Sequence, residues 1–137
     1  MWLVFAFGSA IFAGVTSILA KCGIRKTNST VATAIRTIVV LAFSWLMVLI
    51  AGSQDQISSI DKKTLLFLIL SGLSTGASWL CYFKALQLGD INKVVPIDKL
   101  SILVTVTFSR LVFHERLTRY AAAGLLMMTV GTLVMLF

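Results

Sequence analysis

Long apolar runs are the feature that most constrains how this chain can fold. They recur along the whole sequence and are separated only by short polar connections. A helix that crosses the roughly 30 Å hydrocarbon core of a bilayer needs about 20 mostly apolar residues, because each residue adds about 1.5 Å. Five runs meet this length, at residues 2–20, 31–50, 65–83, 94–113 and 120–137. The sequence therefore predicts an all-α integral membrane fold, a bundle of about five transmembrane helices in one domain over residues 1–137.

Composition and charge support this class and exclude others. Hydrophobic residues make up 58% of the chain and charged residues only 12%, whereas a soluble domain carries roughly 25% charge. The formal net charge of +7 does not indicate nucleic-acid binding, because most Lys and Arg residues stand in the short connections, as membrane-anchoring charges do. The first run begins without a basic segment, so it is expected to be a retained span rather than a secretory signal.

The run at residues 94–113 is the weakest of the five, because it contains Asp98, Lys99 and Arg110. Each charge at the centre of a span costs about 2.5–3.5 kcal/mol. Asp98 and Lys99 are expected in the first helical turn after Pro96 and Arg110 in the last, where long basic side chains can reach the interface. A version with four spans remains the alternative.

An odd number of spans places the two termini on opposite sides of the membrane. A tandem fusion of two copies would then give inverted repeats, which is a common transporter architecture. A protein with one unfused copy can form the same inverted-repeat architecture only as a dimer of oppositely inserted chains. The connections on the two sides carry five basic residues each, and Arg36 and Lys99 inside spans make the widest count seven against five. Because this bias is weak, the predicted assembly is an antiparallel homodimer, with a parallel dimer or a monomer as alternatives.

Three segments resemble the EamA-like domain of the drug/metabolite transporter superfamily. They are YFKALQLGD at 82–90, VPIDKLS at 95–101 and HERLT at 114–118. Most members carry Gly-Glu where this chain has His114-Glu115. The resemblance covers essentially the whole chain and is closest to the short class with a single five-helix domain, equivalent to one half of an inverted-repeat transporter.

The resemblance implies a transporter of small metabolites in the cell's inner (cytoplasmic) membrane, crossing it several times, but it does not name the solute. The short four-helix multidrug-resistance relatives exchange protons for cations through a Glu in their first helix. Residues 2–20 contain no acidic residue, so that mechanism cannot be carried over.

Five residues are the candidate substrate-binding residues: Arg36, Trp79, Tyr82, Asp98 and Lys99. Because successive spans alternate in direction, all five are expected near the same side of the membrane, within about two helical turns of the interface. Ionisable residues inside spans are functional candidates, since they are costly away from a partner or water. In the functional interpretation Arg36 and Lys99 bind an anionic group, Asp98 balances charge or couples to protons, and the aromatic residues form a wall.

A purely structural interpretation of the same residues stays open. Arg36 and Lys99 would then be anchors whose side chains reach the interface, and Trp79 and Tyr82 would belong to the aromatic belt. Asp98 would be stabilised by the dipole at a helix N-terminus.

Other classes find less support. One His, five acidic residues and scattered serines offer no catalytic spacing, and two cysteines offer no metal site, so no enzyme, cofactor or metal is expected. The remaining alternative is a non-transporting membrane subunit or scaffold that packs against a larger protein. The GxxxG pair Gly72 and Gly76 would provide its contact face.

Overall fold

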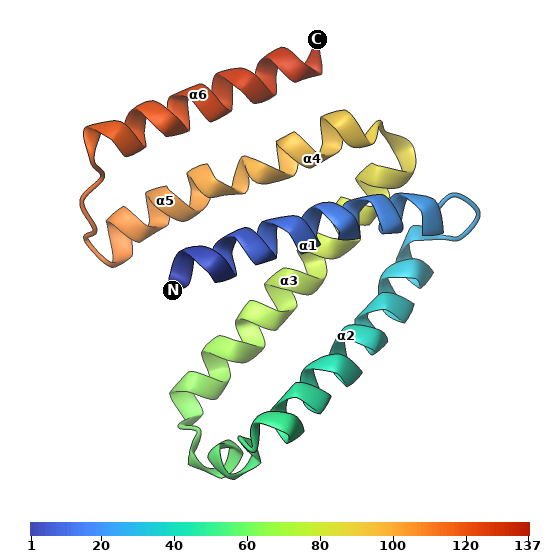
Figure 1. Ribbon diagram of the computed structural model, residues 1–137, viewed down its shortest axis with the longest axis vertical. Helices are drawn as coiled ribbons and strands as arrows, with labels where there is room; N and C mark the ends of the chain where they lie inside the picture. Colours follow the sequence, from blue (N-terminus) through green and yellow to red (C-terminus); the bar gives the residue numbers. More distant parts are fainter. The chain divides into compact units, whose positions relative to one another are not determined.

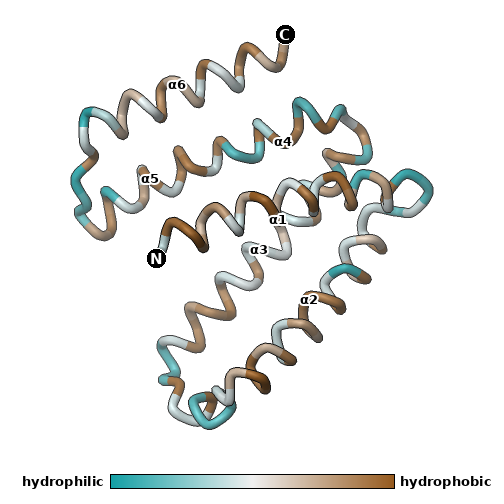
Figure 2. Tube along the Cα trace, viewed as in Figure 1, coloured by the Kyte–Doolittle hydropathy of each residue, from teal (hydrophilic) through white to brown (hydrophobic).

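The computed structural model describes all residues from Met1 to Phe137, and every element in it is helical. Its elements in chain order are α1 (Trp2–Gly23), α2 (Ser29–Ala51), a short 3₁₀ helix η1 (Gln54–Ser59), α3 (Lys62–Leu88), α4 (Ile91–Lys99), α5 (Ser101–Val112) and α6 (Arg119–Leu136), as Figure 1 shows. Helices α1, α2, α3 and α6 are each long and apolar enough to cross a membrane. Brown apolar segments dominate them in Figure 2. The all-α membrane fold class is confirmed.

Polar residues at the helix ends set these bounds. The side chain of Asn28 accepts a hydrogen bond of 2.9 Å from the Thr30 N–H and begins α2. Thr118 does the same for α6 by accepting from the Ala121 N–H at 3.2 Å. Gly52 ends α2 with φ of +65°, a left-handed conformation that glycine adopts without strain. Helices α2 and α6 thus coincide with the predicted runs 31–50 and 120–137 to within a few residues.

The predicted span 94–113 is not one continuous helix. Leu100 separates α4 from α5. The Leu100 N–H donates to the carbonyl of Ile97 at 3.0 Å, and the Leu103 N–H donates to the carbonyl of Leu100 at 2.9 Å. Bonds over three residues are typical of the tighter 3₁₀ geometry, which marks an interruption in a helix. Neither α4 with 9 residues nor α5 with 12 residues has the length of a span by itself.

The expected position of Pro96 at a helix start is also wrong. The Asp90 side chain caps the helix by accepting from the Asn92 N–H at 3.1 Å, so α4 begins earlier, at Ile91. Pro96 therefore lies inside α4, where its ring nitrogen cannot donate to the carbonyl of Asn92. The hydrogen bond that is missing at Pro96 and the interruption at Leu100 are four residues apart in the chain.

The chain divides into two compact units, one of residues 19–87 and one of residues 1–18 with 88–137. In the second unit α4 packs against α5 and α6, and Lys93 Nζ donates to the carbonyl of Leu136 at 3.1 Å. In the first unit the Gln87 amide donates to the carbonyls of Ile24 and Thr27 at 3.2 and 2.8 Å. These bonds tie the end of α3 to the connection between α1 and α2.

Candidate functional site

The candidate site begins with one face of α2. Ser29, Thr33 and Arg36 follow one another at spacings of four and three residues, so they share a helix face. Ser29 and Thr33 are only 4% and 5% exposed. The Thr33 hydroxyl donates to the carbonyl of Ser29 at 2.8 Å, which satisfies it within its own helix. Arg36, the only charged residue on this face, is therefore preceded by two small buried residues, and the Thr33 hydroxyl is already hydrogen-bonded.

The facing surface of α3 is formed by larger side chains. Trp79 and Phe83 are one turn apart, and Leu86 follows on the same side. Phe83 and Leu86 are 1% and 0% exposed and, with Ile24, are the buried hydrophobic residues of the chain. The end of α3 is therefore the best packed part of the unit formed by residues 19–87.

Arg36 is held against this aromatic surface. Its guanidinium carbon Cζ lies 4.7 Å from the ring centroid of Trp79 and 4.9 Å from that of Phe83. Both distances are inside the roughly 6 Å limit of a cation–π contact, which contributes about 0.5–2 kcal/mol depending on desolvation. The contact holds the guanidinium against α3, and the substrate-binding role of Arg36 stays a prediction.

No carboxylate in the surrounding helices compensates this charge. Helices α1, α2 and α3 contain no acidic residue. Asp55 lies beyond the opposite end of α2, whose last residue, Ala51, is about 22 Å from Arg36 along the axis at 1.5 Å per residue. A guanidinium has five N–H donors. The aromatic rings attract its positive charge but do not accept hydrogen bonds from these donors. The arrangement can therefore receive a carboxylate or phosphate oxygen.

The aromatic wall differs from the predicted one in its members. Trp79 contacts Arg36 as the functional interpretation requires. The Tyr82 side chain also lies near enough to Arg36 to interact with its charge, and its ring stacks obliquely on Phe83 with centroids 5.7 Å apart and planes at 54°. Phe83 is the aromatic residue that the sequence interpretation missed. Its spacing of four residues from Trp79 was the available signal, since it puts both rings on one helix face. The role of Tyr82 in substrate binding stays a prediction.

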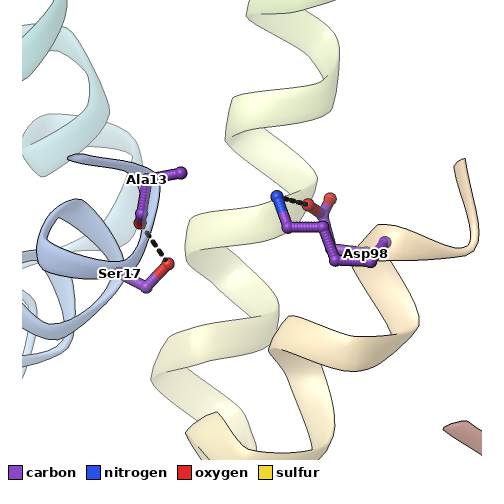
Figure 3. A network of polar contacts seen from close by, with 4 residues as sticks. Ala13, Ser17 and Asp98 are labelled. Carbon is purple, nitrogen blue, oxygen red and sulfur yellow. Dashed lines mark hydrogen bonds and ion pairs between the residues drawn. The ribbon is translucent and has the colours of Figure 1, made fainter. Parts of the chain in front are cut away.

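Asp98 and Lys99 are the last two residues of α4, immediately before the interruption at Leu100. Lys99 Nζ lies 3.8 Å from Asp98 Oδ2, and Figure 3 shows this ion pair together with the hydrogen bond from Ser17 to the carbonyl of Ala13. The expected stabilisation of Asp98 by a helix N-terminus is wrong, because Asp98 stands at the C-terminal end of α4, where the dipole favours cations. Both residues lie outside the unit of Arg36, and a shared site stays a prediction.

Comparison with known proteins agrees with a membrane fold. The chain belongs to the EamA-like transporter family, which it matches over residues 1–137. It is similar to an uncharacterised transporter encoded in the cobO 3' region of a Sinorhizobium species, with 43% identity over 134 residues. The match covers 98% of this chain and 95% of that relative. No solved structure shows a significant match.

These matches confirm the resemblance seen in the three sequence segments. They identify the protein as a multi-pass membrane protein of a transporter family.

Proposed function

We propose that the protein transports a small metabolite carrying a carboxylate or phosphate group, and that Arg36 binds this anionic group. The observation that carries the proposal is the guanidinium 4.7 and 4.9 Å from the Trp79 and Phe83 rings, in a set of three helices without an acidic residue. The rings fix the position of the charge and leave its N–H donors to a ligand. The planar guanidinium group of arginine recognises carboxylate and phosphate groups through paired hydrogen bonds.

Asp98 and Lys99 are proposed as further substrate contacts, with Lys99 as a second cation and Asp98 as a group that balances charge or exchanges protons. Support comes from the interruption of their own helix at Leu100. Transporters often bind substrates and ions at discontinuous membrane helices, where backbone groups released from the helix line the cavity. Tyr82 is proposed to complete the aromatic wall beside Phe83.

The working unit is proposed to be a homodimer in the inner membrane, in which each chain supplies one half of an alternating-access transporter. A single domain of this family has one repeat, and two oppositely inserted copies recreate the inverted pair that moves about a central site. The nearly balanced basic residues of the two sides support antiparallel insertion.

A second candidate function is a non-transporting subunit of a larger membrane protein. It is favoured by the Gly72 and Gly76 face of α3, where a Cβ added to either glycine would have nothing within 4 Å. Such a face allows a helix from another protein to approach closely. A second copy of this chain would use the same face, so the observation fits both candidates.

Flux into vesicles that contain only this protein tests the proposal. A first screen measures thermal stabilisation by carboxylated, phosphorylated, neutral and cationic metabolites, since a ligand at about 100 times its Kd stabilises by about 2.7 kcal/mol. Solutes that stabilise the protein are then used for flux. We expect anionic solutes to be transported, Arg36→Gln to abolish flux, and Arg36→Lys to lower it about tenfold because an ammonium lacks the planar fork.

Arg25→Gln is the matched control, because Arg25 is exposed in the connection after α1 and touches neither ring. It should leave flux unchanged. Full activity of Arg36→Lys would show an anchoring role and overturn the site. Silent vesicles together with a stoichiometric membrane partner would favour the subunit.

A further inference from the structure

The connection between α5 and α6 encloses a second basic site, independent of Arg36. A cavity of about 440 Å³ opens there. The residues that line it are Arg110, His114, Glu115, Arg116 and Leu117. All five are exposed at the surface of their unit, and in Figure 2 the connection is a polar teal segment between two apolar helices. The cavity therefore combines positive charge with a position at the start of α6, a helix long and apolar enough to cross a membrane.

The walls of this cavity are held in place by the backbone. The Phe113 N–H closes α5 by donating to the carbonyl of Ser109 at 2.9 Å. His114 then adopts φ of +54°, the left-handed conformation that usually requires glycine. Thr118 caps α6 from the other side by accepting from the Ala121 N–H at 3.2 Å. Between two fixed ends, the strained His114 turns the chain so that the next three residues line the cavity.

The charge balance of the cavity is positive. Arg110 and Arg116 supply two guanidinium groups, and Glu115 is the only acidic residue among the lining side chains. The Glu115 carboxylate already accepts a hydrogen bond from the Ser109 hydroxyl. Its charge is thus partly satisfied by its own segment, and the two guanidinium groups are left to attract an anion with several acceptor oxygens.

We propose that this cavity binds a phosphate group, and that the phosphate is the headgroup of an anionic phospholipid. Two guanidinium groups match the oxygens of a phosphate, which accepts paired hydrogen bonds from each. Apolar side chains stand directly beside the charges, with Leu111, Val112 and Phe113 exposed to 66%, 63% and 73%. A phospholipid supplies both chemistries in one molecule, since its phosphate can bind the arginines while its acyl chains contact the neighbouring apolar side chains.

Retention of lipid by the full-length protein in detergent tests the proposal. Native mass spectrometry measures the binding of phosphatidylglycerol, which is anionic, and of phosphatidylcholine, which is neutral overall. The test variant is Arg110→Gln with Arg116→Gln. The matched control is Lys62→Gln with Lys63→Gln at the start of α3, which removes two exposed charges that do not line this cavity. General surface attraction contributes about fivefold for each basic residue near a bilayer, so it changes equally in both variants.

We expect phosphatidylglycerol binding to fall in the cavity variant by at least about tenfold more than in the control, because two charged hydrogen-bonding partners are lost. His114→Gly and His114→Ala both remove the imidazole, but only glycine adopts the left-handed conformation without strain. His114→Gly should therefore melt at or above the wild-type temperature, and His114→Ala should melt below it. Equal losses in the cavity and control variants, or no loss in either, would overturn the site.

A second arm distinguishes the source of the phosphate. Inorganic phosphate alone is titrated against wild type and the cavity variant by thermal shift. Stabilisation that depends on Arg110 and Arg116, without retained phosphatidylglycerol, would support a phosphate site with a soluble ligand. Absence of both signals would contradict the proposal. Unchanged melting of the cavity variant in the absence of ligand would show that the variant is folded.

Discussion

At the scale of single residues, Arg36 is stabilised by aromatic rings where an acidic partner is missing. Its Cζ atom lies 4.7 Å from the Trp79 ring and 4.9 Å from the Phe83 ring. Such contacts weaken little in an apolar environment, because no charged partner must be desolvated along with the arginine. A substrate anion that binds the N–H donors would add to these contacts without displacing them. In the proposed site, the rings would hold the charge in position for a ligand.

The contact between Arg36 and Trp79 predicts energetic coupling between them. In a double-mutant cycle of Arg36→Gln and Trp79→Leu, we expect a coupling of about 0.5–2 kcal/mol in the free energy of unfolding. The measurement is equilibrium unfolding in mixed micelles. Trp45 supplies the control, because it lies on the same helix as Arg36 and is 51% exposed. Arg36→Gln with Trp45→Leu should be additive, and equal coupling in both cycles would show that the rings do not hold Arg36.

Sequence reasoning could find Arg36 and Trp79 because a charge and a large aromatic stand out within apolar runs. Phe83 could not be singled out in the same way, since phenylalanine is an ordinary member of such runs, and the chain has 9 of them. What distinguishes Phe83 is burial, with 1% of the residue exposed. Burial depends on which helix face meets a neighbour, and the apolar runs are apolar on all sides.

At the scale of elements, the interrupted segment α4–α5 is the part of the fold that composition alone describes least well. The sequence interpretation places Asp98 and Lys99 in the first turn of a helix that starts at Pro96. The Asp90 cap instead starts α4 at Ile91, so Asp98 lies about 10 Å along the helix at 1.5 Å per residue. Capping depends on a single hydrogen bond, and that bond was not visible in the hydropathy pattern.

Replacement of the proline tests whether the interruption serves transport. Pro96→Ala supplies an N–H that can donate to the carbonyl of Asn92, and it removes the ring that clashes with this carbonyl. We expect the helix to become more continuous and the stability to rise, by at most the roughly 3 kcal/mol that a proline costs in a helix interior. Flux should fall, because Asp98 and Lys99 would turn with the straightened helix.

The neighbouring substitution Val95→Ala serves as the control for this prediction. It places the same residue type in the same turn of α4 but leaves Pro96 unchanged. Its flux should stay near the wild-type value, with at most a modest loss of stability from the removed methyl groups. Wild-type flux in Pro96→Ala would mean that the interruption has no part in transport.

At the scale of the whole molecule, the chain buries very little of its apolar surface by itself. Ile24, Phe83 and Leu86 are its buried hydrophobic residues, whereas Trp2, Phe12 and Leu73 are 75%, 74% and 67% exposed. In water an apolar surface of this kind would drive association. In a bilayer it contacts lipid or the helices of a second copy, which is why the fold class followed from composition while the helix contacts did not.

Membrane orientation provides the last prediction, because an antiparallel homodimer needs chains inserted both ways. The two sides carry nearly equal numbers of basic residues. Gln54→Lys, Gln56→Lys and Ser58→Lys add three charges to the exposed connection that contains η1. Counted over the connections, the change turns five against five into eight against five. This triple variant should therefore insert mainly in one orientation, since the side richer in Lys and Arg stays cytoplasmic. Reporters fused after Phe137 should then detect the wild type on both sides and the variant on one.

Transport should respond to the same change of orientation. The triple variant alone should lose most of its flux, because it cannot form the antiparallel pair. The opposite bias is built by Gly23→Lys, Thr27→Lys and Leu88→Lys, where Leu88 is 76% exposed and a Cβ at Gly23 meets nothing within 4 Å. Each biased variant should be inactive alone, and co-expression should restore flux, since one chain of each orientation is then present. A wild type found in one orientation, or a biased variant with full flux alone, would instead support a parallel dimer or a monomer.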